Sequence, residues 1–154
     1  MKTVVKMFKP QFAELVRTGK KCQTIRPTPK RMPKVGDMVS LRCWADKPYR
    51  SKHVSLGDGR IRNVYPIRIY ADQIRIYADH EEEPIQWEMW IGDRFLTIRE
   101  ADSVARADGF PGVCEMLEWF EQEHGFPFEG ILIRWELSSN SGVRCQPDMR
   151  TNKD

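Results

Sequence analysis

The order of hydrophobic and polar positions divides the chain into short strands and helices. Runs rich in strand-forming residues predict strands over residues 3–8, 20–26, 38–44, 86–91 and 129–135. Helical spacing predicts helices over residues 10–18, 98–107 and 112–124. The last helix is the clearest, because its hydrophobic side chains recur on one face from Val113 to Phe120. Pro10 suits the first position of the first helix, and Gly19 suits its end.

Two segments in the middle of the chain have special patterns. Residues 45–60 are polar, and Gly57-Asp58-Gly59 predicts the tip of a hairpin. The sequence Ile-Arg-Ile-Tyr-Ala-Asp occurs at residues 67–72 and again at 74–79. This odd offset would send the two isoleucine pairs to opposite faces of one unbroken strand. We therefore expect a bulge or turn near Gln73, or a strand that is buried on both faces.

The order of these elements favours an α+β protein over a parallel βαβ fold, because most strands follow one another without a crossover helix. We expect a small, mostly antiparallel β-barrel with flanking α-helices. The length of 154 residues suits one domain, which we assign to residues 1–137. Residues 138–154 are polar and aperiodic, and we expect them to form a flexible tail.

The charge distribution adds an asymmetry that the net charge of +3 hides. Residues 1–62 carry 16 Lys or Arg and 4 Asp or Glu, a balance of +12. Residues 63–154 carry 9 basic and 18 acidic residues, a balance of −9. A basic half of this kind hints at contact with nucleic acid or a membrane surface.

Several classes of protein are disfavoured by the same sequence. No apolar run approaches the ~20 residues that span a bilayer, and the first residues are charged, so we expect a cytoplasmic protein without membrane contact. The four cysteines form no CxxC pair and the three histidines are scattered, which gives a metal site little support. Nucleotide-binding and common hydrolase motifs are missing, and we expect no cofactor.

The concentrated polar element is the segment 19–27, Gly-Lys-Lys-Cys-Gln-Thr-Ile-Arg-Pro. On a strand, Thr24 and Arg26 would point to one face, and Lys20 and Lys21 stand at its entry. The loop that follows adds three basic residues, Lys30, Arg31 and Lys34. From composition alone, a solvated basic edge strand is the favoured interpretation, because edge lysines block aggregation.

The same segment resembles the ASCH domain, a branch of the PUA-like superfamily. The resemblance rests on a helix with Phe12 and Leu15, on Gly19-Lys20-Lys21, on Thr24-Ile25-Arg26, and on Gly36-Asp37 at the start of a strand. Ala107-Asp108-Gly109-Phe110, the following helix and the last strand resemble the second half of the family, so about residues 3–136 are covered. The resemblance implies a PUA-like β-barrel with a basic cleft. Residues 45–90 match nothing in it and are interpreted as a lineage-specific elaboration.

The PUA-like superfamily is associated with RNA and modified nucleosides, so the resemblance implies one of these as the partner. Some small bacterial ASCH proteins are amidohydrolases of N4-acetylcytidine, with a reactive lysine, threonine and glutamate. Carried over, Lys21 and Thr24 match the lysine and the threonine, and Asp108 is the nearest match to the glutamate. Aspartate is one methylene shorter, which puts its reach in question. Lys20, Arg26, Lys30, Arg31 and Lys34 would then bind the substrate or RNA.

The resemblance and the residues leave three functions open. In an amidohydrolase, Thr24 would attack and Lys21 would take its proton, since the nearby charges of Lys20 and Arg26 favour a neutral lysine. In a non-catalytic module, basic side chains would contact phosphates while Trp44, Tyr49 or Tyr65 stack on bases. The third alternative is a ribonuclease.

Overall fold

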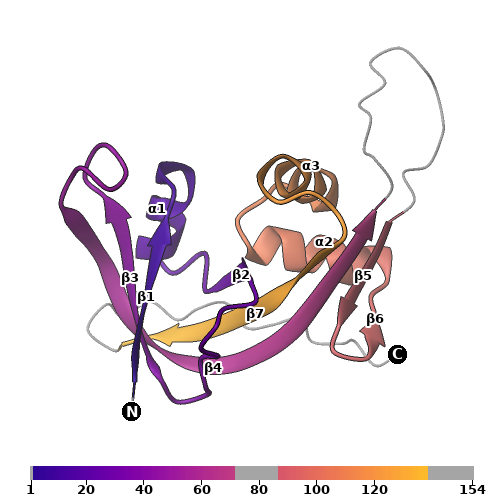
Figure 1. The fold of residues 1–154 in the computed structure, drawn as a ribbon, viewed down its shortest axis with the longest axis horizontal. Helices are drawn as coiled ribbons and strands as arrows, with labels where there is room; N and C mark the ends of the chain where they lie inside the picture. Colours follow the sequence, from indigo (N-terminus) through magenta and orange to yellow (C-terminus); the bar gives the residue numbers. More distant parts are fainter. Residues whose placement is uncertain (1, 72–86, 139–154) are drawn as a thin grey trace.

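The computed structural model describes residues 2–71 and 87–138 of the chain. Within these residues seven strands form one sheet, and three helices accompany it (Figure 1). The strands are β1 (Thr3–Phe8), β2 (Gln23–Pro27), β3 (Met38–Trp44), β4 (His53–Ala71), β5 (Trp87–Ile91), β6 (Arg94–Phe95) and β7 (Phe128–Leu137). The helices are α1 (Pro10–Arg17), α2 (Ile98–Ala107) and α3 (Val113–Glu123).

The long strand β4 organises the sheet, because it pairs with three other strands. Its first part pairs with β3, its middle with β7 and its end with β5, and all three pairs are antiparallel. At the outer positions, β2 pairs with β7 in antiparallel fashion and β1 pairs with β3 in parallel. The predicted α+β class with a mostly antiparallel sheet is confirmed. The barrel is not confirmed, because among the described strands β1 and β2 do not pair and the sheet stays open between them.

The predicted hairpin tip at Gly57-Asp58-Gly59 is wrong, because β4 begins at His53 and runs through these residues. A Cβ atom at Gly59 would lie 2.8 Å from the carbonyl oxygen of Glu136 on β7. Glycine is therefore needed at position 59 for the close approach of two strands, and not for a turn. The register of the β3–β4 pairing shifts just beyond Gly57, which pairs with Leu41. The chain reverses earlier, over residues 45–52.

The first helix ends as the sequence predicts, and this end positions Lys21. Gly19 follows the helix with a φ of +78°, a left-handed conformation that suits glycine. The backbone N–H of Lys21 then donates to the carbonyl of Leu15 at 2.9 Å. The sequence Gly-Lys-Lys thus closes the helix and fixes the backbone of the second lysine just before β2.

The other predicted elements agree closely with the structure. Strands β1 and β3 and helix α2 have the predicted bounds, and α3, β5 and β7 differ from the predictions by one or two residues at an end. Helix α2 begins with a capping box, in which Thr97 and Glu100 each accept a hydrogen bond from the backbone N–H of the other. The short strand β6 was not predicted. The second copy of the repeat and the predicted tail lie outside the described residues, apart from position 138.

The sheet bends strongly, so the helices stand at two sides of a trough. Figure 1 shows α1 beside β1 and β3 at one side, with α2 and α3 above the other end of β4 and β7. The core fills the space below the helices with side chains such as Val16, Leu41, Met116 and Phe120, which are fully buried. Among the described residues, no helix is long and apolar enough to cross a bilayer.

Candidate functional site

Lys21 and Asp108 form an ion pair inside the protein. The side chains are 2% and 7% exposed, and the Nζ atom of Lys21 lies 3.1 Å from Oδ1 of Asp108. Nζ also donates to the main-chain carbonyl of Asp108. The ammonium group lies 4.9 Å from the ring centre of Phe12, which adds a cation–π contact. The predicted lysine and carboxylate are therefore brought together, and the shorter aspartate does reach the lysine.

The carboxylate of Asp108 stands at an electrostatically unfavourable place. Asp108 is the C-cap of α2, where the negative end of the helix dipole opposes a second negative charge. Gln23 helps to hold it, because its Nε2 donates to the carbonyl of Val104 at 3.1 Å and lies 3.4 Å from Oδ1 of Asp108. The cation of Lys21 stabilises the buried carboxylate of Asp108 at this helix end. Gln23 is a site residue that the sequence analysis missed.

Arg26 and Thr24 form the second pair of the site. On β2 the Nε atom of Arg26 donates to Oγ1 of Thr24 at 3.0 Å, so the two side chains share one face as predicted. The Nη2 atom of Arg26 donates to the main-chain carbonyl of Met7 on β1 at 2.6 Å. Arg26 thus bridges the open seam of the sheet between β1 and β2, and its guanidinium lies 5.1 Å from the ring centre of Phe8.

The charge of Arg26 acts on two lysines of this region, and we call Lys6, Lys21 and Arg26 the basic cluster. Burial lowers the pKa of Lys21 most, Asp108 opposes this, and Arg26 lowers it further. The pKa of Arg26 is lowered by burial, again opposed by Asp108. Burial and then Arg26 lower the pKa of Lys6. The expected neutralising effect of Lys20 is wrong, because its side chain is exposed and burial is the leading cause at Lys21.

Lys6 is a second site residue that the sequence reasoning missed. It lies on β1 between Val4 and Phe8, and these three alternate residues are more buried than Thr3 and Val5. A lysine in such an inward position of a strand is unusual, because lysine is seldom buried without a partner. The alternation in residues 3–8 was therefore a signal that could have found it.

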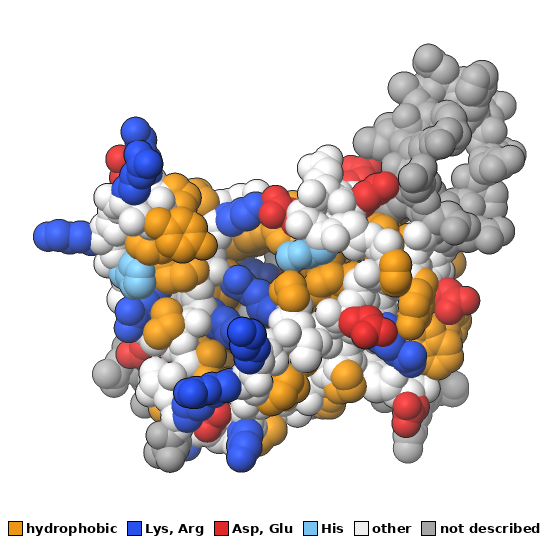
Figure 2. All heavy atoms as spheres, viewed as in Figure 1, with side chains coloured by type: hydrophobic (Ala, Val, Ile, Leu, Met, Phe, Trp, Pro, Cys, Tyr) orange, Lys and Arg blue, Asp and Glu red, His pale blue; other side chains and the backbone are white. Residues whose placement is uncertain are grey.

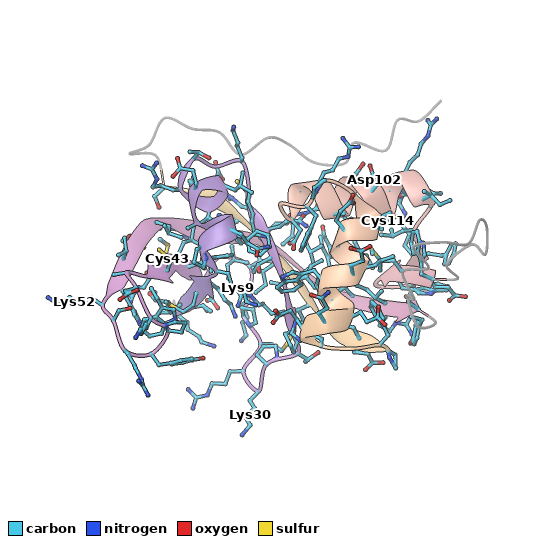
Figure 3. All side chains as sticks on the ribbon, turned by 90° about the horizontal axis from the view of Figure 1, so that it is seen from above. Lys9, Lys30, Cys43, Lys52, Asp102 and Cys114 are labelled. Carbon is cyan, nitrogen blue, oxygen red and sulfur yellow. The ribbon has the colours of Figure 1, made fainter. Side chains whose placement is uncertain are left out.

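The remaining predicted binding residues are exposed and do not join the basic cluster. This holds for Lys20, Lys30, Arg31 and Lys34. Lys30 stands at the tip of its loop and points away from the body of the protein (Figure 3). These four side chains therefore stand in solvent and not with the buried pair of Lys21 and Asp108.

The face of the protein shown in Figure 2 is hollowed near its middle. Figure 2 shows Lys and Arg side chains gathered over the middle of one face, in a depression between the part built by α1, β1 and β3 and the part built by α2 and α3. Lys9 lies between these parts and pairs with Glu123 at the end of α3, with Nζ 2.5 Å from Oε1 (Figure 3). Burial lowers the pKa of His124, Glu123 opposes this, and the charges of Arg26 and Lys9 lower it further. We call this depression the central hollow.

No group of three His, Cys, Asp or Glu residues in the described part of the chain could hold a metal ion. Cys22 is disulfide-bonded, whereas Cys43 and Cys114 are free thiols.

Comparisons of the chain with protein-family models, curated proteins and solved structures found no match. The function must therefore be argued from the geometry of the site.

Proposed function

We propose that the protein binds RNA or a modified nucleoside in the central hollow. The observation that carries this proposal is the charge of the basic cluster. Lys21 is paired with Asp108. Lys6 and Arg26 are partly buried and form no ion pair with a described residue. Desolvated cations need anionic partners, and one carboxylate supplies only part of the compensation. A phosphate group would supply the rest, and the exposed lysines and arginines of the 27–37 loop would contact neighbouring phosphates.

The fold is compatible with this proposal. The resemblance to the ASCH domain implies a PUA-like barrel, and we propose that the open seam between β1 and β2 is the place where such a barrel remains incomplete. Arg26 spans this seam by its bond to Met7. A ligand that contacts Arg26 would therefore meet both edge strands at once.

The binding test uses a fluorescein-labelled ribo-oligonucleotide of five nucleotides and measures anisotropy at several salt concentrations. Lys6→Met should weaken binding and lower the log–log salt slope by about 0.7, because one phosphate contact of a single strand is lost. The matched control is Arg99→Gln, which removes an exposed charge from α2 and should leave the slope unchanged. Equal slopes for the wild type and Lys6→Met would contradict binding in the hollow.

Hydrolysis of an N-acyl cytidine amide is a second candidate function, and the burial of Lys21 favours it. Burial shifts Lys21 towards its neutral form, which can accept a proton. Because Oγ1 of Thr24 accepts its hydrogen bond from Arg26, its own proton stays available for donation. In this mechanism Thr24 attacks the acyl carbon, Lys21 takes the hydroxyl proton and returns it to the leaving amine, and water then hydrolyses the ester. Arg26 would stabilise the oxyanion.

Release of acetate from N4-acetylcytidine tests this second function. Thr24→Val replaces the hydroxyl by a methyl group of similar size and should abolish release, whereas Thr24→Ser keeps the hydroxyl and should retain it. No release by the wild type between pH 6 and about pH 10 would exclude the hydrolase and leave the binding function. Gel electrophoresis of RNA after the same incubations tests the ribonuclease alternative.

A further inference from the structure

The connection between β3 and β4 presents aromatic side chains outside the basic cluster. We call residues 44–53 the tip. Tyr49 is 89% exposed, which is the largest exposure among the large hydrophobic side chains reported for the described residues. Its ring centre lies 5.3 Å from that of Trp44, and Trp44 lies 4.5 Å from His53 on the paired strand. Three rings therefore form a small aromatic surface that contributes little to the core.

The backbone of the tip is held in a defined shape. Ser51 accepts a hydrogen bond from the N–H of Asp46 at 3.1 Å and donates to the carbonyl of Lys47 at 2.8 Å. The N–H of Ala45 donates to the carbonyl of Lys52 at 2.9 Å, which closes the turn. Tyr49 itself has a φ of +62°, a left-handed conformation that is uncommon for an aromatic residue. Strain at an exposed aromatic side chain is typical of a functional position.

The tip is also strongly basic. Three basic residues, Lys47, Arg50 and Lys52, accompany one acidic residue, Asp46, and Arg42 lies just before the tip on β3. Within the described chain, Lys47, Arg50 and Lys52 make no ion pair, and Arg42 contacts Nδ1 of His53 at 3.2 Å. Lys52 points outward at the end of the molecule (Figure 3). Basic side chains also project at this end in Figure 2, on the face that carries the central hollow.

We propose that the tip is a second contact site for single-stranded RNA, at which Tyr49, supported by Trp44, stacks on a base while Arg50 and Lys52 contact the flanking phosphates. Exposed rings beside unpaired cations are the combination that single-strand binders use, because every base has a flat face and every linkage has a charge. An acidic protein segment would use the cations and leave the rings without a flat partner. The proposal rests on the proposed function, since the hollow and the tip would hold one continuous strand.

The test compares labelled oligouridylates of five and fifteen nucleotides by anisotropy. The long probe offers more phosphates and more bases than the short probe, so a protein that uses both the hollow and the tip should bind the long probe more tightly. Tyr49→Asn should weaken the long probe by about tenfold, in the range expected for one lost stack. Asparagine tolerates the left-handed backbone, so the turn is retained. Tyr49→Phe keeps the ring and should bind like the wild type.

Charge variants complete the test. Lys52→Gln should reduce the salt slope for the long probe by about 0.7, and Arg99→Gln on α2 is the control that should not. If Tyr49→Asn binds the long probe like the wild type while Lys6→Met binds it more weakly, RNA contact at the tip is refuted and binding in the hollow stands. If Tyr49→Asn weakens the long probe and Lys6→Met has no effect, the hollow is refuted and the tip stands. Absence of binding by either probe overturns both.

A labelled polyglutamate peptide distinguishes RNA from an acidic protein partner. The peptide should bind weakly, and its affinity should not depend on the ring at position 49. If it binds as tightly as the long oligouridylate and is weakened equally by Tyr49→Asn, the tip is a site for acidic protein segments and the RNA proposal is overturned.

Discussion

The buried ion pair gives a quantitative prediction about stability. In Lys21→Met the apolar part of the side chain is retained and the cation is lost, so Asp108 stays buried with Gln23 as its remaining side-chain donor, at 3.4 Å. Breaking a buried pair on one side costs about 3–5 kcal/mol. Because Gln23 and the positive charge of Arg26 still stabilise the carboxylate, we expect a loss near the lower end, about 3 kcal/mol.

Urea denaturation followed by tryptophan fluorescence measures this loss. With a slope of about 2 kcal/mol per molar urea, the midpoint should fall by about 1.5 M without a change of slope. Lys21→Met/Asp108→Asn removes both charges and should return to within about 1 kcal/mol of the wild type, since a pair replaced on both sides is close to neutral. Two results would refute the buried pairing. One is a Lys21→Met midpoint equal to that of the wild type. The other is a double variant whose loss of stability equals the sum of the losses of the two single variants.

Two more predictions concern the same site. The pKa of Lys21 is lower in the folded protein than in the unfolded chain. Between that lowered value and about pH 10.5 the unfolded chain therefore binds more protons than the folded protein. The free energy of unfolding should rise with pH through this window. Chemical denaturation at several pH values should show this rise in the wild type and a smaller one in Lys21→Met; parallel curves would contradict it. Gly130→Ala would place a Cβ atom against the carbonyl oxygen of Arg26, and should cost at least ~2 kcal/mol in thermal melts because β2 must move. Gly36→Ala, with no atom within 4 Å, is the control and should lose only about 1 kcal/mol to left-handed strain; equal losses would contradict the steric argument.

The local elements were predictable because they depend on neighbours in the sequence. Pro10 and Gly19 mark the ends of α1, and the Val113–Phe120 periodicity marks α3, since capping and helical spacing act within a few residues. The glycines of residues 57–59 misled the prediction, because a glycine in a turn and a glycine at a close strand approach have the same local sequence. Only the presence of β7 beside Gly59 separates the two cases.

The candidate site was predictable only in part. Lys21, Thr24 and Arg26 lie within six residues, so their grouping follows from the sequence, and the helix end at Gly19 fixes where Lys21 enters. Asp108 was named through a family resemblance, and its contact with Lys21 depends on how α2 packs against the start of β2. Distances between residues 87 positions apart are set by packing, which no local pattern encodes.

The sequence by itself determined the order of elements, the α+β class and a basic first half. The tertiary structure decided how that charge is distributed: Lys6, Lys21 and Arg26 are drawn inward, while Lys30 and Lys52 project into solvent. Of the three inward cations, Lys21 is the one that forms an ion pair with Asp108. The physical reason is that burial depends on the packing of distant strands and helices, and burial is what changes the chemistry of a lysine. The same residue type is therefore a solvated charge on a loop and a perturbed, paired group in the core.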